Sequence, residues 1–189
     1  GHFSRSSRRA KLAQIHGLDR PAGVQCRCRR LALVIFTLML AELSMPVVEK
    51  NVLVAHTPAQ MFHLVDDVER YPKFLPWCAR GEVISRQGPE LVASLHIDYL
   101  KIRQHFTTRN YNHDDYTIDM TLVDGPFEQL SGGWRFIPLG DIGCKIEFRL
   151  NYEFSSKILE KIIGPVFSHI SGTLVDCFIR EADRLYGDD

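Results

Sequence analysis

Apolar residues recur every three to four positions along the last long stretch of the chain, from Ser156 to Tyr186. This spacing is typical of a helix that buries one broad face, and at 1.5 Å per residue that helix would be roughly 45 Å long. Glu181 leaves a gap in the apolar face. Proline removes a backbone hydrogen bond, so Gly164-Pro165 predicts a short helix ending at Gly164 and a second helix beginning at Pro165. The alternative is one helix bent over a ligand.

A strand and a helix are predicted where the apolar pattern begins. Val47 to His56 alternates at its start and is apolar at its end, which indicates a strand. Thr57 is a favourable helix cap and Pro58 suits the first helical position, so a helix is expected to follow and to end near Arg70.

From Gly81 to Phe154 the period is two. Turn-forming sequences such as Asp124-Gly125-Pro126 separate about six alternating segments, each with one apolar and one polar face. One buried face and one solvated face are the signature of an antiparallel meander. We therefore predict an α+β fold in which a curved antiparallel sheet wraps around the long C-terminal helix.

The predicted inner face of this sheet collects large side chains. Aromatic and flexible apolar residues dominate it: Tyr99, Phe106, Met120, Trp134, Phe136, Phe148 and Tyr152. Plain core packing is the simpler interpretation, and a ligand pocket is the alternative, because pockets are mostly apolar with a few polar anchors. The aromatic, proline-rich segment from Tyr71 to Cys78 is either a plug that closes the core or the lip of such a pocket.

Candidate catalytic chemistry is sparse. The sequence contains no glycine-rich phosphate loop, no HExxH and no GxSxG motif. The histidines lack the spacing of metal ligands, so we predict neither a catalytic residue nor a metal site. Five cysteines without a framework spacing indicate reduced thiols in a reducing compartment.

Charge is distributed unevenly although the net charge is zero. Residues 1–44 contain eight basic and two acidic residues, and residues 45–189 carry the compensating net charge of −6. An acidic domain is not an obvious polyanion binder, and no DNA contact is expected. A basic strip of Lys101, Arg103, His105 and Arg109 lies on two adjacent predicted strands, where Arg103 and Arg109 could contact RNA. A solvated sheet face is the simpler interpretation.

The first 44 residues form an extension with a short apolar run, Leu31 to Ala41, behind three arginines. The run is too short for an ordinary membrane span of about 20 residues. We expect it to lie outside the fold, as a segment upstream of the true start at Met45; a membrane-associating arm and a secretory signal are the alternatives.

Three sequence blocks resemble a known family. They are Tyr71-Pro72-x-Phe74-Leu75-Pro76-Trp77-Cys78, Gly125-Pro126-Phe127 with its continuation to Phe136, and Phe178 to Gly187. In this order, over residues 46–187, they resemble the START-like helix-grip proteins once named oligoketide cyclases. The branch that includes the coenzyme Q-binding proteins and the bacterial RatA toxin is the most similar.

The resemblance implies an apolar cavity between the long helix and the sheet. Phe74 and Trp77 would then border the entrance. The aromatic and apolar residues of the inner face would line the wall, and the helix would close the cavity with Phe167, Ile170, Leu174 and Phe178.

The resemblance also implies a function. The leading expectation is non-enzymatic binding of ubiquinone or another polyisoprenoid lipid, as a carrier that supports respiration and holds no covalent cofactor. The alternative is a RatA-like toxin that binds the large ribosomal subunit and blocks subunit association. A polyketide cyclase ranks last, because no acid–base pair converges on the predicted pocket. The expected location is the cytoplasm, with peripheral contact to the inner membrane as an option.

Overall fold

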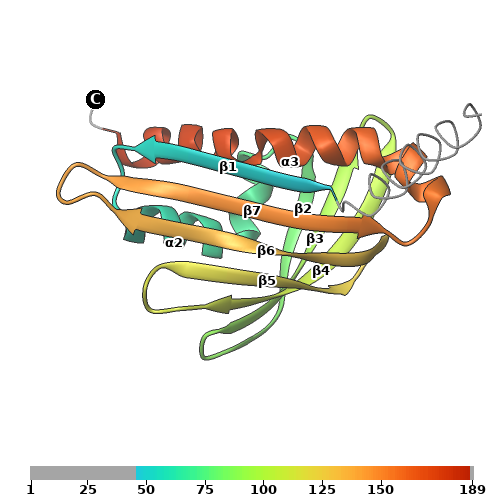
Figure 1. The fold of residues 1–189 in the computed structure, drawn as a ribbon, viewed down its shortest axis with the longest axis horizontal. Helices are drawn as coiled ribbons and strands as arrows, with labels where there is room; N and C mark the ends of the chain where they lie inside the picture. Colours follow the sequence, from blue (N-terminus) through green and yellow to red (C-terminus); the bar gives the residue numbers. More distant parts are fainter. Residues whose placement is uncertain (1–45, 188–189) are drawn as a thin grey trace, which may run out of the picture. The chain divides into compact units, whose positions relative to one another are not determined.

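The computed structural model describes residues 46–187 (Figure 1). The predictions made for residues 1–44 lie outside this range. The described part is an α+β domain, as the sequence predicts. Its elements are β1 (Val47–Val54), α2 (Pro58–Asp66), the 3₁₀ helix η1 (Val68–Lys73), β2 (Cys78–Gln87), β3 (Glu90–Tyr99), β4 (Ile102–Asn112), β5 (Thr117–Asp124), β6 (Phe127–Pro138), β7 (Cys144–Phe154) and α3 (Lys157–Tyr186).

One antiparallel sheet contains all seven strands of the described domain, in the spatial order β1-β7-β6-β5-β4-β3-β2. Strands β2 to β7 form the predicted meander, and β1 pairs with β7 at the far edge. The strands β2, β3 and β4 run steeply across the direction of β6 and β7, so the sheet is strongly twisted (Figure 1). The long helix α3 lies lengthwise against this curved sheet.

The start of α2 follows from its sequence. Gln60 N donates to Thr57 Oγ1 at 3.2 Å and Thr57 N donates to Gln60 Oε1 at 2.8 Å, which is a capping box. The helix ends at Asp66, whereas the sequence predicted an end near Arg70. Asp67 leaves helical geometry (ψ 67°), and the chain then continues as the tighter η1. The buried Tyr71 hydroxyl donates to the Val65 carbonyl at the end of α2, at 2.6 Å.

Helix α3 is unbroken, so the predicted end at Gly164 is wrong. Pro165 costs one backbone hydrogen bond, but its own side chain is exposed. Ile163 and Phe167, on either side of it, are buried against the sheet and hold the helix in place. By length and composition α3 could cross a membrane; in this domain its apolar face is core.

Strand β2 begins at Cys78, before the two-residue period that the sequence shows from Gly81. Asp98 N donates to the Trp77 carbonyl at 3.1 Å and extends the pairing with β3. Tyr116 occupies the turn before β5, with a positive φ of 61°. The turn at Gly125 is as predicted. Its φ is +147°, and a Cβ there would lie 2.7 Å from the Cβ of Phe106.

Candidate functional site: an apolar cavity under α3

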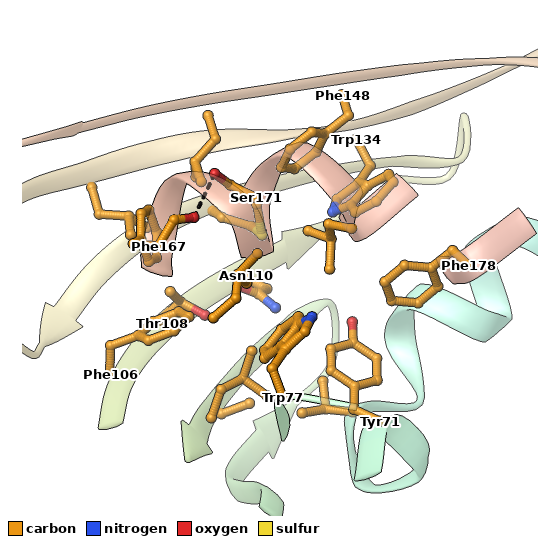
Figure 2. Close-up of a pocket in the computed structure, with 18 residues that line it drawn as sticks. Tyr71, Trp77, Phe106, Thr108, Asn110, Trp134, Phe148, Phe167, Ser171 and Phe178 are labelled. Atoms are coloured by element: carbon orange, nitrogen blue, oxygen red, sulfur yellow. Dashed lines mark hydrogen bonds between the residues drawn. The ribbon is translucent and has the colours of Figure 1, made fainter. Parts of the chain in front are cut away.

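A cavity of about 80 Å³ lies between α3 and the inner face of the sheet (Figure 2). Strands β3 to β7 contribute its wall, η1 and the residue before β2 contribute one end, and α3 closes it. The wall is dominated by aromatic rings. Trp134 packs against Phe148 with ring centroids 4.4 Å apart, and against Phe178 of α3 at 5.3 Å.

Nine of the sequence-predicted site residues line this cavity. They are Trp77, Phe106, Met120, Trp134, Phe148, Phe167, Ile170, Leu174 and Phe178. Strand alternation and helical periodicity therefore correctly predicted that these side chains of β4, β5, β6, β7 and α3 line one cavity. Ligand binding by these residues remains a prediction.

The other four predicted residues do not line the cavity. Phe74 packs edge-on against Phe178, with ring centroids 5.1 Å apart, and is not among the lining residues. Tyr99 is near the end of β3 and stacks on His169 of α3. Phe136 is buried against Phe62 of α2 and Tyr152 against Phe167. Helix α2 covers Phe136, and the N-terminal half of α3 covers Tyr99 and Tyr152, so those parts of the inner face are ordinary core packing.

Polar groups at the cavity were missed from the sequence. Thr108, Asn110, Ser171 and the Tyr71 hydroxyl all belong to lining residues. Thr108 and Asn110 lie on the same face of β4 as Phe106, so the alternation along this strand was sufficient to predict that both point toward the cavity. The Ser171 hydroxyl is satisfied inside the helix, where it donates to the Phe167 carbonyl at 2.8 Å.

Two buried polar atoms of the wall have no hydrogen-bond partner among residues 46–187. They are the indole Nε1 of Trp77, a residue 3% exposed, and the amide Oδ1 of Asn110, a residue 8% exposed. Such orphaned groups are rare in folded proteins and each is costly. Apart from these two residues and the hydroxyls of Tyr71, Thr108 and Ser171, the lining residues are apolar.

Titratable groups are nearly absent from the wall. Of the described residues, no carboxylate, histidine, lysine, arginine or cysteine lines the cavity, and Tyr71 is the exception among ionisable side chains. Burial raises the pKa of the Tyr71 phenol far above its ordinary value of 10, so this hydroxyl stays protonated. General acid–base chemistry has no evident partner here.

The three cysteines of the domain are free and buried, as expected from their apolar surroundings. Burial raises the pKa of Cys78 to about 11 and that of Cys144 to about 11. Burial raises the pKa of Cys177 as well. Because the thiolate is the reactive form, these thiols are inert core residues.

The basic strip is exposed but locally compensated. Arg103 Nε lies 3.0 Å from Asp98 Oδ2, and Arg109 Nε lies 3.4 Å from Glu90 Oε1. Both pairs bridge β3 and β4 on the outer face of the sheet, away from the cavity. Lys101 lies in the turn between these strands, with a positive φ of 69°, rather than on a strand.

These features define a START-like, helix-grip protein with an apolar cavity between a curved sheet and a C-terminal helix. Residues 54–179 match the model of the family described as polyketide cyclase / dehydrase and lipid transport, and the chain belongs to that family.

Several relatives carry functional names. The ribosome association toxin RatA of Vibrio cholerae is 43% identical over 141 residues, which are 75% of this chain and 98% of that protein. RatA of Escherichia coli K12 is 38% identical over 78% of this chain and 94% of its own length. The mitochondrial coenzyme Q-binding protein COQ10 homolog B of Xenopus laevis is 28% identical over 68% of this chain and 54% of its own length.

Solved structures agree on the fold. An 18 kDa protein of Caulobacter crescentus has a TM-score of 0.59 at 33% identity, covering 77% of this chain and all of that protein. The Zhui aromatase/cyclase of Streptomyces sp. R1128 has a TM-score of 0.67 at 18% identity, covering 75% of this chain and 95% of the enzyme, and supports the fold alone.

Proposed function

We propose that this protein associates with the large ribosomal subunit and blocks the joining of the subunits. The observation that carries the proposal is the 43% identity to a ribosome association toxin over 98% of that relative's length. This revises the sequence-based ranking, in which ubiquinone binding came first. The proposed activity is non-enzymatic and cytoplasmic.

The size of the cavity supports this revised order. A space of about 80 Å³ is well below the roughly 300–1,000 Å³ of ordinary small-molecule sites. A long polyisoprenoid tail would require α3 to move away from the sheet, at the cost of the contacts that Phe167 and Phe178 make there.

The basic strip, which lies on β4 and the turn before it, is the proposed contact with ribosomal RNA. Arg103 and Arg109 are both exposed, with side chains 83% and 55% accessible. Exposed ion pairs contribute little stability, so each guanidinium can exchange its carboxylate for a phosphate at small cost. The displaced Asp98 and Glu90 remain nearby and limit the affinity, which fits a domain with a net charge of −6.

Sedimentation tests the proposal directly. The 189-residue chain would be added to purified small and large subunits, and the mixture would be separated on sucrose gradients at low and high salt. We expect fewer joined ribosomes, with the chain in the large-subunit fraction and released as salt rises, because phosphate contacts are salt-dependent. Unchanged joining, with the chain left at the top of the gradient at low salt, would reject it.

A second candidate function, binding of a small apolar ligand, is favoured by a specific observation. The cavity has an aromatic wall and two unpartnered polar atoms, which is the usual composition of a ligand site. The relative named as a coenzyme Q-binding protein agrees with this candidate. Organic extraction of the purified chain followed by mass spectrometry tests it: a stoichiometric lipid or quinone supports the candidate, and an empty extract counts against it.

A further inference from the structure

Trp77 and Asn110 each present one unpartnered polar atom in the wall of the cavity. The Trp77 indole can only donate, through Nε1–H, and the Asn110 Oδ1 can only accept. Neither atom has a protein partner within the described domain, and both residues are more than nine-tenths buried. Figure 2 shows both side chains projecting into the lined space from different elements, Trp77 from the segment before β2 and Asn110 from β4.

Water alone is a poor occupant of this space. A cavity of about 80 Å³ could hold several water molecules, since one needs roughly 10–15 Å³ of such free volume. Each water also needs two to four polar partners. The wall offers few. The hydroxyls of Tyr71 and Ser171 already donate to backbone carbonyls and can only accept from a water. Thr108, Asn110 and Trp77 supply the other polar groups. A molecule with an apolar body and one polar end suits the wall better.

We propose that the cavity selects a small aromatic ligand that carries a hydroxyl group, such as a phenol or a hydroquinone, rather than one that carries only acceptors, such as a quinone. A hydroxyl oxygen accepts from Trp77 Nε1–H while its hydrogen is donated to Asn110 Oδ1. A carbonyl oxygen satisfies Trp77 and leaves Asn110 Oδ1 unpaired. The rings of Trp134, Phe148 and Phe106 provide the aromatic contacts for the ligand's body.

This inference rests on the second candidate function, the binding of a small ligand, and specifies its chemistry. It is independent of ribosome association. The reduced and oxidised forms of one quinone share the same carbon skeleton and nearly the same shape, so we expect the polar pair to contribute most of the difference between them. Burying an unpaired acceptor costs enough to change an affinity by about tenfold.

Matched ligands test the proposal. The compounds p-cresol and p-xylene have the same size and differ in one hydroxyl against one methyl group. Titration calorimetry of the 189-residue chain would give both dissociation constants. Without polar partners the hydroxyl is penalised for leaving water, and p-xylene would bind more tightly. With both partners in place, we expect p-cresol to bind about tenfold more tightly.

Three variants assign the effect to the two residues. Trp77→Phe and Asn110→Leu each remove one partner and keep most of the apolar volume, and each should abolish the preference for p-cresol. Trp134→Phe removes the same atoms elsewhere on the same wall, so it should shift both affinities in parallel and keep their ratio. Thermal unfolding of every variant checks that it folds.

The outcomes distinguish the hydroxyl-selective site from the more general hypothesis that the cavity binds a small ligand. If the wild type binds p-xylene as tightly as p-cresol or more tightly, or if Trp77→Phe and Asn110→Leu keep the preference, the hydroxyl-selective site is wrong while the apolar cavity stands. If neither compound binds, ligand binding in the cavity fails altogether, and the proposed site fails with it.

Discussion

Arg70 of η1 donates a hydrogen bond to Glu181 of α3, from Nη2 to Oε1 at 3.3 Å, across 111 residues of sequence. Arg184, one turn further along α3, binds the same carboxylate through two hydrogen bonds of 2.7 Å. Glu181 is only 4% exposed and fills the gap that the sequence showed in the apolar face of the helix. A buried carboxylate is tolerated here because both arginines neutralise it.

Replacing Glu181 by Gln should destabilise the domain. The substitution removes the charge that holds two arginines, and a buried hydrogen bond to a charged group contributes about 2 kcal/mol. The free energy of unfolding in urea at pH 7 would measure the loss. Glu153→Gln, on the exposed face of β7, is the matched control and should change little. Equal stabilities of the two variants would contradict the assigned role.

The same carboxylate should make stability depend on acidity. The hydrogen bonds from Arg184 are the main reason that the pKa of Glu181 lies below its ordinary value of 4.5. A carboxyl group whose pKa is lowered by folding contributes its full stabilisation at any pH above its unfolded-state pKa. This contribution is lost as the pH falls through the folded-state pKa. The wild type should therefore approach the stability of Glu181→Gln below pH 4.5. A constant difference down to the acid transition would argue against this linkage.

Gly125→Ala should be strongly destabilising. Its φ of +147° disfavours any side chain, and the new methyl group would lie 2.7 Å from the Cβ of Phe106. We expect a loss of about 2–3 kcal/mol in chemical denaturation. Gly88→Ala is a suitable comparison, because Gly88 also has a positive φ but nothing within 4 Å of an added Cβ. It should lose about 1 kcal/mol.

The buried thiols should resist modification in the native state. With the pKa of Cys78 and Cys144 raised to about 11, the thiolate fraction is very small at pH 8. A chain with Cys26 and Cys28 replaced by Ser should react slowly with a thiol reagent, and its rate should rise with pH up to about 11. Unfolding in guanidinium should expose all three thiols at once. Rapid native labelling at pH 8 would show that the domain opens easily.

Charge reversal should identify the ribosome-facing surface. Arg109→Glu removes a proposed phosphate contact and should lower the slope of log affinity against log salt by about one. Arg149→Glu is the matched control. Arg149 also forms an exposed cross-strand pair, with Glu49 at 3.4 Å, between β7 and β1 near the opposite edge of the sheet. If both variants bind large subunits equally, the contact lies elsewhere.

Alternation along the strands predicted the face of each side chain but not its position under the helices. Trp134 and Phe148 point into the cavity as expected, whereas Phe136, on the same face of β6, lies under α2. Periodicity in a strand contains no information about which helix covers which end. For that reason the sequence identified most of the apolar wall and also included residues of the ordinary core.

Two further differences have definite physical reasons. Asn110 was passed over because a polar side chain on a buried face is unfavourable unless something satisfies it, and that partner is not evident from the chain. Pro165 was given too much weight as a helix breaker. One lost hydrogen bond is offset by the buried residues on both sides of it, a tertiary effect that local sequence does not report.

The pairing of β1 with β7 sets an order of events during synthesis. Among the strands of residues 46–187, β1 leaves the ribosome before the others and pairs in the sheet with β7 alone, about a hundred residues later; α3 follows later still. Because distant contacts must form before such a sheet is stable, folding should be slow and should wait for the C-terminus. A chain that is stopped early would expose the apolar face of an open sheet, so loss of α3 should lead to degradation or aggregation rather than to a smaller working domain.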